Sequence, residues 1–296
     1  MSQRSPAVAG QFYPASLKQC RAEVAQYLSA AEPAARRVTP VHPVAGIVPH
    51  AGWVCSGAVA AEVIQAVGRD PDIETFVVFG AIHRVRGRQA SVDPEGSWIT
   101  PLGEIAIDEE LARAVLAASP LLVADAHSHV PEHSIEVQVP FIQYIRPAAR
   151  LLPILVPPAE GAAEVGRVVA EQVRALGRKA VFLGSTDLTH YGPRYFFTPK
   201  GIGAEGLTWA RNVSDRRLID LCLRLAADEI VPEANANHNA CGSGAVAATL
   251  AVARQCGATE SRLCRHTTSA EVLREKLGPM TDSVGYAGIV FSRPAM

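Results

Sequence analysis

Residues 180–192 read AVFLGSTDLTHYG, and this stretch decides the fold. Its first six residues are apolar or small and of strand length, so they predict a buried β-strand. A continuous apolar run is typical of a strand that is covered on both faces, as in a parallel sheet. The strand leads directly into a polar segment that carries Asp187 and His190. The stretch therefore predicts a strand of a parallel sheet with reactive side chains at its carboxyl end.

The rest of the chain repeats this alternation of strands and helices. Strand-like runs occur at 44–48, 75–81, 151–156 and 283–291. Helical patterns cover 16–30, 56–67, 108–118, 134–145, 162–176, 214–226 and 243–255. We expect Pro140 to kink or interrupt its helix, and residues 30–37 to form a surface link. Strands alternating with helices predict an α/β fold, one domain over residues 1–296 with a mainly parallel central sheet flanked by helices.

Composition excludes several classes of protein. The chain has 296 residues, with 28 Lys and Arg against 29 Asp and Glu, so a basic surface for nucleic acid or membrane binding is not expected. No apolar run approaches the roughly 18 residues of a membrane-spanning helix. The six cysteines are scattered and include no CxxC pair, which favours reduced thiols. We therefore expect a soluble, cytoplasmic protein with a small-molecule substrate.

Polar side chains follow three of the predicted strands. His50 follows the strand at 44–48, His83 follows the strand at 75–80, and Asp187 and His190 follow the strand at 180–185. The carboxyl ends of parallel strands meet at one edge of a sheet, where ligands bind. These four residues are therefore candidates for a shared site.

Cys241 is a fifth candidate, in the segment NHNACGSG at 237–244. A helix is expected to begin just after it, and a helix N-terminus favours the thiolate form that binds metals or attacks electrophiles. Gly242 and Gly244 would let a ligand approach the backbone. Two imidazoles and one thiolate would give a metal three protein ligands and leave a position open for water or substrate.

Structural explanations compete with each of these assignments. A lone histidine such as His50 or His83 is often a surface or hydrogen-bonded residue, and the spacing of Asp187 and His190 also suits an N-cap. Small residues after Cys241 are typical of tight packing. The densest histidine cluster, His127, His129 and His133, would suit either a metal site or a solvated loop.

Eight short motifs, in this order, resemble the Memo family, which includes protein B of the AmmeMemoRadiSam system. They are RSPAVAGQFYP (4–14), IVPHAGWVCSG (47–57), FGAIH (79–83), TPLG (100–103), EHSIEVQVPF (132–141), GSTDLTHYG (184–192), ACGSG (240–244) and SVGYAG (283–288). The resemblance spans almost the whole chain. It implies a fold like that of the class III extradiol dioxygenases.

The resemblance also implies roles for individual residues. His50, His83 and Cys241 correspond to the metal ligands of the extradiol enzymes, His190 to their acid/base histidine, and Asp187 would orient His190. Those enzymes have a carboxylate where this chain has Cys241, so catechol dioxygenase activity does not follow from the fold. The resemblance favours Fe(II), with Cu or Zn as alternatives, in an oxidoreductase or dioxygenase-like enzyme.

Substrate contacts, partners and rival functions complete the expectations. Trp53 and His133 are expected to contact the substrate, and radical SAM and AMMECR-like proteins are the expected partners. One rival function is a thiol hydrolase in which Cys241 is the nucleophile, His190 or His50 is the base, and Asp187 orients the base. Another is a protein that binds a metal or a peptide without turnover.

Overall fold

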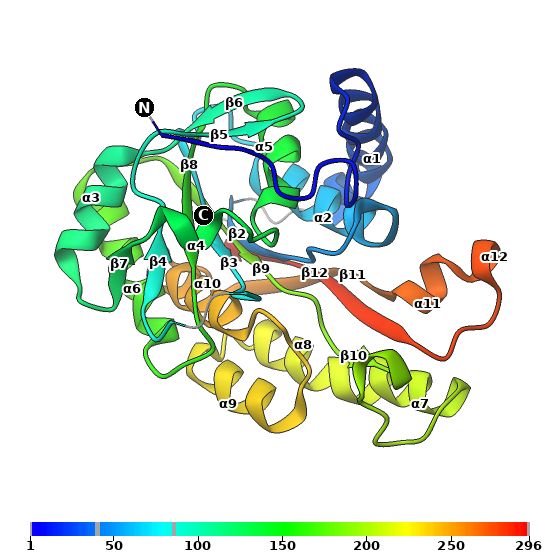
Figure 1. Ribbon diagram of the computed structural model, residues 1–296. Coiled ribbons are helices and arrows are strands. Elements are labelled where there is room, and N and C mark those ends of the chain that lie inside the picture. The colour runs from blue at the N-terminus through cyan, green and yellow to red at the C-terminus, as the bar shows by residue number, and fades with distance from the viewer. Residues whose placement is uncertain (1, 39–41, 85–86, 295–296) are drawn as a thin grey trace.

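The computed structural model describes residues 2–38, 42–84 and 87–294 (Figure 1). Within these residues, nine strands form one mixed sheet in the order β10-β12-β2-β9-β3-β8-β4-β7, with β11 also paired to β12. The strands are β2 (His42–Val48), β3 (Thr75–Gly80), β4 (Ala90–Val92), β7 (Leu122–Ala124), β8 (Arg150–Leu155), β9 (Ala180–Ser185), β10 (His190–Tyr191), β11 (Glu260–Thr268) and β12 (Ser283–Arg293). A small second sheet joins β1 (Gln3–Arg4), β5 (Ser97–Thr100) and β6 (Gly103–Ala106).

The centre of the main sheet is parallel, as the apolar runs predict. Strands β2, β9, β3 and β8 pair in parallel, whereas β12 pairs with β2 and β4 pairs with β8 in antiparallel fashion. Every residue of β3 is buried, because helices cover the sheet on both faces. All five predicted strands are present. The strands of the main sheet that the sequence analysis did not predict are two or three residues long or, like β11, half-exposed and polar.

Alternate side chains of each central strand enter two different cores. In β3, Phe76 and Val78 pack against one set of helices, and Val77 and Phe79 pack against the other. The first set, on one side of the sheet in Figure 1, is α1 (Leu17–Val38), α2 (Trp53–Val67) and α5 (Val139–Ile145). The second set is α3 (Glu109–Ala118), α6 (Ala162–Ala175), α8 (Asp215–Leu223), α9 (Ala227–Asn237) and α10 (Ser243–Gln255). The short helices are α4 (Ala126–His129), α7 (Ala204–Trp209), α11 (Ser269–Val272) and α12 (Arg274–Leu277).

Two expectations about helix boundaries have different outcomes. The predicted link at 30–37 is wrong, because α1 continues to Val38; Leu28 and Ala31 are buried, so the helix has an apolar face to pack beyond residue 30. The interruption at Pro140 is confirmed. A 3₁₀ turn at Glu136–Gln138 precedes α5, and Pro140 lies in the first turn of that helix, where its missing N–H has no helical partner to lose.

Across the described residues, no helix combines the length and apolar character needed to cross a membrane.

Candidate metal centre

Side chains from the loops after three neighbouring strands lie close together. Strand β9 pairs in parallel with both β2 and β3, so the carboxyl ends of the three strands lie side by side. His50 follows β2 by two residues, His83 follows β3 by three, and Asp187 follows β9 by two. The sheet topology therefore gathers residues that are more than a hundred positions apart in the sequence.

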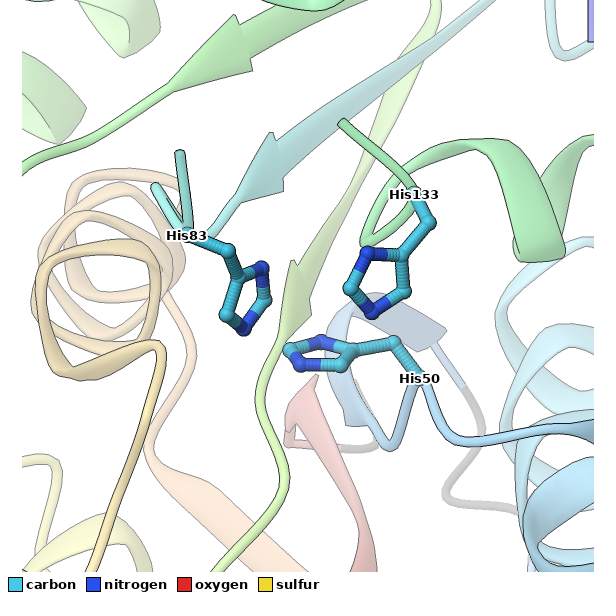
Figure 2. Close-up of side chains that lie close together, drawn as sticks. All are labelled: His50, His83 and His133. Atoms are coloured by element: carbon cyan, nitrogen blue, oxygen red, sulfur yellow. The ribbon is translucent and has the colours of Figure 1, made fainter. Parts of the chain in front are cut away.

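A cluster of three imidazoles occupies this point. Figure 2 shows His50, His83 and His133 pointing toward one another from three separate segments. The ring centroids of His50 and His83 are 5.1 Å apart, and the ring of His133 lies 4.7 Å from His83 and 5.4 Å from His50. One nitrogen from each ring lies within 4.8 Å of the others, a spacing at which the three could hold a metal ion. His133 comes from the loop before α5, not from a strand end.

Ser185 fixes the tautomer of His50. The Ser185 hydroxyl donates to the carbonyl of Ser134 (2.7 Å), so its oxygen accepts from Nδ1–H of His50 (2.8 Å). The lone pair of His50 is then on Nε2, which lies 3.1 Å from Sγ of Cys241. Burial lowers the pKa of His50 well below its ordinary value, and the nearby His83 and His133 lower it further. His50 is therefore a neutral imidazole, the form that binds metals.

Glu132 holds His83 in the same way. Its carboxylate accepts from Nδ1 of His83 (2.9 Å) and from the backbone N–H groups of His83, His133 and Ser134. Burial lowers the pKa of His83, but the bonds to Cys241 and Glu132 outweigh burial and raise it to about 10. Burial would raise the pKa of Glu132, yet its bonds to His83 hold that pKa well below its usual range. A carboxylate behind a histidine is the usual support of a metal ligand.

Cys241 lies at the same point, beside His50 and His83. Its Sγ lies 3.1 Å from Nε2 of His50, accepts the N–H of Asp187 at 3.3 Å and interacts with the ring of His83. Burial raises the pKa of the thiol, although the adjacent His83 opposes this. A protonated thiol between two imidazoles is a ligand that a bound cation would deprotonate.

The glycines after Cys241 serve packing, not ligand approach. A Cβ on Gly242 would lie 2.3 Å from the carbonyl oxygen of Ser185. A Cβ on Gly244 would lie 2.3 Å from the carbonyl oxygen of Pro157. The space beside each glycine is filled by backbone at the end of β9 and in the loop after β8, so the expectation of a ligand there is wrong. Close packing brings α10, and Cys241 before it, against the strand ends.

His190 and Asp187 lie in the loop after β9 but have different partners. Nδ1 of His190 donates to the carbonyl of Leu188 at 3.0 Å, which makes Nε2 the acceptor of the ring. The carboxylate of Asp187 accepts the backbone N–H of His50 at 2.8 Å, and burial raises its pKa. The bond that orients His190 thus comes from Leu188, whereas Asp187, which was expected to orient it, holds the backbone of His50.

Trp53, His127 and His129 lie outside this centre. Trp53 is 2% exposed, stacks on Tyr13 (centroids 5.1 Å apart) and donates from its indole to the carbonyl of Val137 (3.0 Å), so its side chain belongs to the core. His129 is buried and contacts the carbonyl of Ser91, and His127 is exposed. Of the densest histidine cluster in the sequence, only His133 reaches the centre.

Comparison with known proteins places this geometry in a family. A family model for Memo-like proteins matches residues 4–290. The chain belongs to the Memo family. It is 39% identical over 303 residues to a MEMO1 family protein of Thermococcus kodakarensis, covering 98% of this chain and 99% of that protein. It is 39% identical over 304 residues to another from Pyrococcus abyssi, with the same coverage of 98% and 99%.

The fold of this Memo chain is similar to that of a solved structure. A crystal structure of an uncharacterized protein of Escherichia coli K12 matches with a TM-score of 0.52 at 11% identity, over 84% of this chain and 99% of that one. At that identity the likeness concerns the fold alone.

Sequence reasoning missed two supporting residues of the centre, Glu132 and Ser185. Glu132 is the first residue of the motif EHSIE and lies directly beside the candidate His133. Ser185 lies in the motif GSTDLTH, within the predicted strand at 180–185. A carboxylate next to His133 was a usable signal for Glu132. Ser185 is the last residue of β9 and offered no sign beyond its position at the strand end.

Proposed function

We propose that this protein is a metal-dependent enzyme of the oxidoreductase or dioxygenase-like type, with one iron(II) held by His50, His83 and Cys241. The observation that carries the proposal is the 3.1 Å approach of Nε2 of His50 to Sγ of Cys241, with each ligand histidine held from behind by Ser185 or Glu132. Two imidazoles and one thiolate suit iron, copper or zinc once His83 and Cys241 have given up their protons to the cation, and three protein ligands leave a position open.

Protein groups around this set supply acid/base chemistry. The metal would act as a Lewis acid toward a bound small molecule. His190 is positioned by the carbonyl of Leu188 so that Nε2 can take a proton from that molecule or return it. Ser185 and Glu132 keep the ligand nitrogens of His50 and His83 aimed at the centre. Each of these roles assumes the metal site proposed above.

His133 is the competing third ligand. Its ring belongs to the three-histidine group, and its substitution would therefore also perturb a metal. We assign His133 to the substrate side because Cys241 already contacts Nε2 of His50, whereas the ring of His133 has Glu132 as its polar neighbour, 3.5 Å from Nδ1.

A thiol enzyme is the second candidate, favoured by the same contact between Cys241 and His50. A nucleophilic cysteine needs a lowered pKa, whereas burial raises the pKa of Cys241. The two candidates differ in their response to chelators. A thiol enzyme would keep its reactivity at Cys241 after chelation, and the metal enzyme would lose activity.

The family resemblance extends the proposal beyond the site. We propose one domain over residues 1–296 on a scaffold of the class III extradiol type. We also propose a cytoplasmic role beside radical SAM and AMMECR-like proteins, with a small molecule and neither nucleic acid nor membrane as the ligand.

Anaerobic metal loading tests the proposal. The wild type is expected to bind one Fe(II) per chain, His50→Ala to bind none, and Cys241→Ser to bind more weakly, with His133→Ala retaining the metal. His42→Ala is the matched control, because His42 is exposed and remote from the cluster. Absence of stoichiometric Fe(II), Zn or Cu in the wild type would overturn the proposal. Metal lost in His133→Ala but kept in Cys241→Ser would replace the thiolate by the third histidine.

A further inference from the structure

A cavity of about 300 Å³ opens onto the candidate centre. Its polar lining consists of His190, Asn235, His238, Cys241 and Ser243, and small apolar residues close the remainder. The lining thus holds two imidazoles, an amide, a hydroxyl and a thiol, and none of the lining residues is Asp, Glu, Lys or Arg. The volume suits a small organic molecule. An anionic group would meet donors here without facing a carboxylate.

His238 has an unusual backbone conformation. It ends α9 with φ 51° and ψ 39°, in the left-handed region. Such a conformation costs an L-residue other than glycine or asparagine roughly 1–2 kcal/mol. Helices that end in this conformation usually have glycine or asparagine there, so a histidine at this position carries a conformational cost that its surroundings must offset.

The surroundings of His238 fix this conformation. Its backbone N–H bonds to the carbonyl of Ala234 at 2.8 Å. The next residue, Asn239, is buried and donates to the carbonyl of Ser214 (3.0 Å) and to the Glu233 carboxylate (3.1 Å). The ring of Phe197 meets the His238 ring edge-on with centroids 5.8 Å apart. His238 is therefore held at the cavity three residues before Cys241.

We propose that His238 and Asn235 form a subsite for the carboxylate of a small organic acid, whose other end lies at Cys241 and His190. Asn235 lies in the last turn of α9 and His238 caps that helix, and both line the same cavity. Both groups donate hydrogen bonds, and bonds to a charged acceptor are the strong ones. This inference rests on the proposed function for the reacting end of the molecule, and it adds the substrate class.

Protection of Cys241 from alkylation tests the subsite without any metal. Metal-free protein is treated anaerobically with iodoacetamide, and alkylation of Cys241 is followed by peptide mass spectrometry with Cys256 as the internal reference. The probes are straight-chain carboxylates from acetate to hexanoate, each paired with the alcohol of the same length. At about ten times its Kd, a carboxylate that fits should slow Cys241 alkylation about tenfold. Its alcohol should not.

Two variants separate binding from folding. His238→Gly relieves the left-handed strain, so its thermal midpoint should equal or exceed that of the wild type while the carboxylate binds about tenfold more weakly. Asn235→Ala should also weaken protection. Asn237→Ala is the matched control, because the Asn237 amide bonds to the carbonyl of Glu233 and is not part of the cavity lining.

The outcomes distinguish this subsite from the metal centre. The subsite is overturned if no carboxylate protects Cys241 better than its alcohol, or if His238→Gly keeps full protection. Metal content is measured on the same samples, and His238→Gly should bind Fe(II) as the wild type does. If the wild type binds no metal but carboxylates protect Cys241, the proposed function fails and the subsite stands.

Discussion

Glu132 holds His83 by the ring and by the backbone at once. The carboxylate accepts from Nδ1 of His83 through one oxygen and from the His83 N–H through the other, each at 2.9 Å. This double contact fixes both the position of the loop after β3 and the orientation of the ring. His83 therefore presents Nε2 to the centre before any metal arrives.

Glu132→Gln should accordingly weaken metal binding without unfolding the protein. An amide can replace only some of these bonds, and loss of a supporting carboxylate lowers metal affinity by about 10–100-fold in comparable sites. Competition with a chelator of known affinity would measure the change. Glu104→Gln is the control, because Glu104 is exposed on β6. An unchanged affinity in Glu132→Gln would remove Glu132 from the metal site.

Gly244→Ala should destabilise the protein and disturb Cys241. The added Cβ would lie 2.3 Å from the carbonyl oxygen of Pro157, and backbone cannot move aside as a side chain can. Overpacking of this kind costs about 1–3 kcal/mol of the free energy of unfolding. Denaturant titration measures the loss, and Gly87→Ala is the control because its nearest neighbour would be 3.7 Å away. Equal stability in the two variants would contradict the close packing of α10.

The parallel centre of the sheet was predictable from the sequence, because a strand that is buried on both faces is a continuous run of apolar residues. Strands such as β3 and β9 consist of apolar or small residues, and no polar alternation confuses them. Strand β11 carries two arginines and a histidine on a half-exposed ladder beside β12, so its pairing depends on tertiary contacts that the sequence does not display. The length of α1 was missed because residues 30–37 resemble a surface link in sequence, whereas Ala31 is buried and the helix continues past it.

The candidate centre was predictable as far as strand ends determine it. His50, His83 and Asp187 follow neighbouring parallel strands, and that topology alone brings them together. His133 enters from a loop whose path depends on Glu132, which bonds to both loops. The partner of Asp187 also depends on three-dimensional detail, since its carboxylate bonds to the backbone of His50 rather than to His190.

Stability should fall in mild acid because of His129. Its pKa is lowered from the ordinary 6.5 to about 4, mainly by burial and also by Arg4, although the bond to the Ser91 carbonyl opposes the shift. Between these values the unfolded chain takes up a proton that the folded chain does not. Stability contributed by the neutral ring is therefore present above pH 6.5 and lost as the pH falls toward 4. The loss is up to about 3 kcal/mol.

His129→Gln isolates this contribution, because glutamine keeps an N–H donor for Ser91 and does not titrate. Denaturant titrations at several pH values should give a flatter pH dependence for this variant than for the wild type. His127→Gln, at an exposed position, should follow the wild type. Parallel curves for the wild type and His129→Gln would show that the acid sensitivity arises elsewhere.

Trp53→Phe decides between a structural and a substrate-binding role for this aromatic residue. The indole packs against Phe141 with centroids 4.7 Å apart and donates to the carbonyl of Val137, so phenylalanine would lose both volume and a hydrogen bond. We expect a loss of about 1–3 kcal/mol in the free energy of unfolding. Fe(II) affinity and carboxylate protection of Cys241 should be unchanged, because the Trp53 side chain is not part of the cavity lining. Weaker protection in a stably folded Trp53→Phe protein would return Trp53 to the substrate opening.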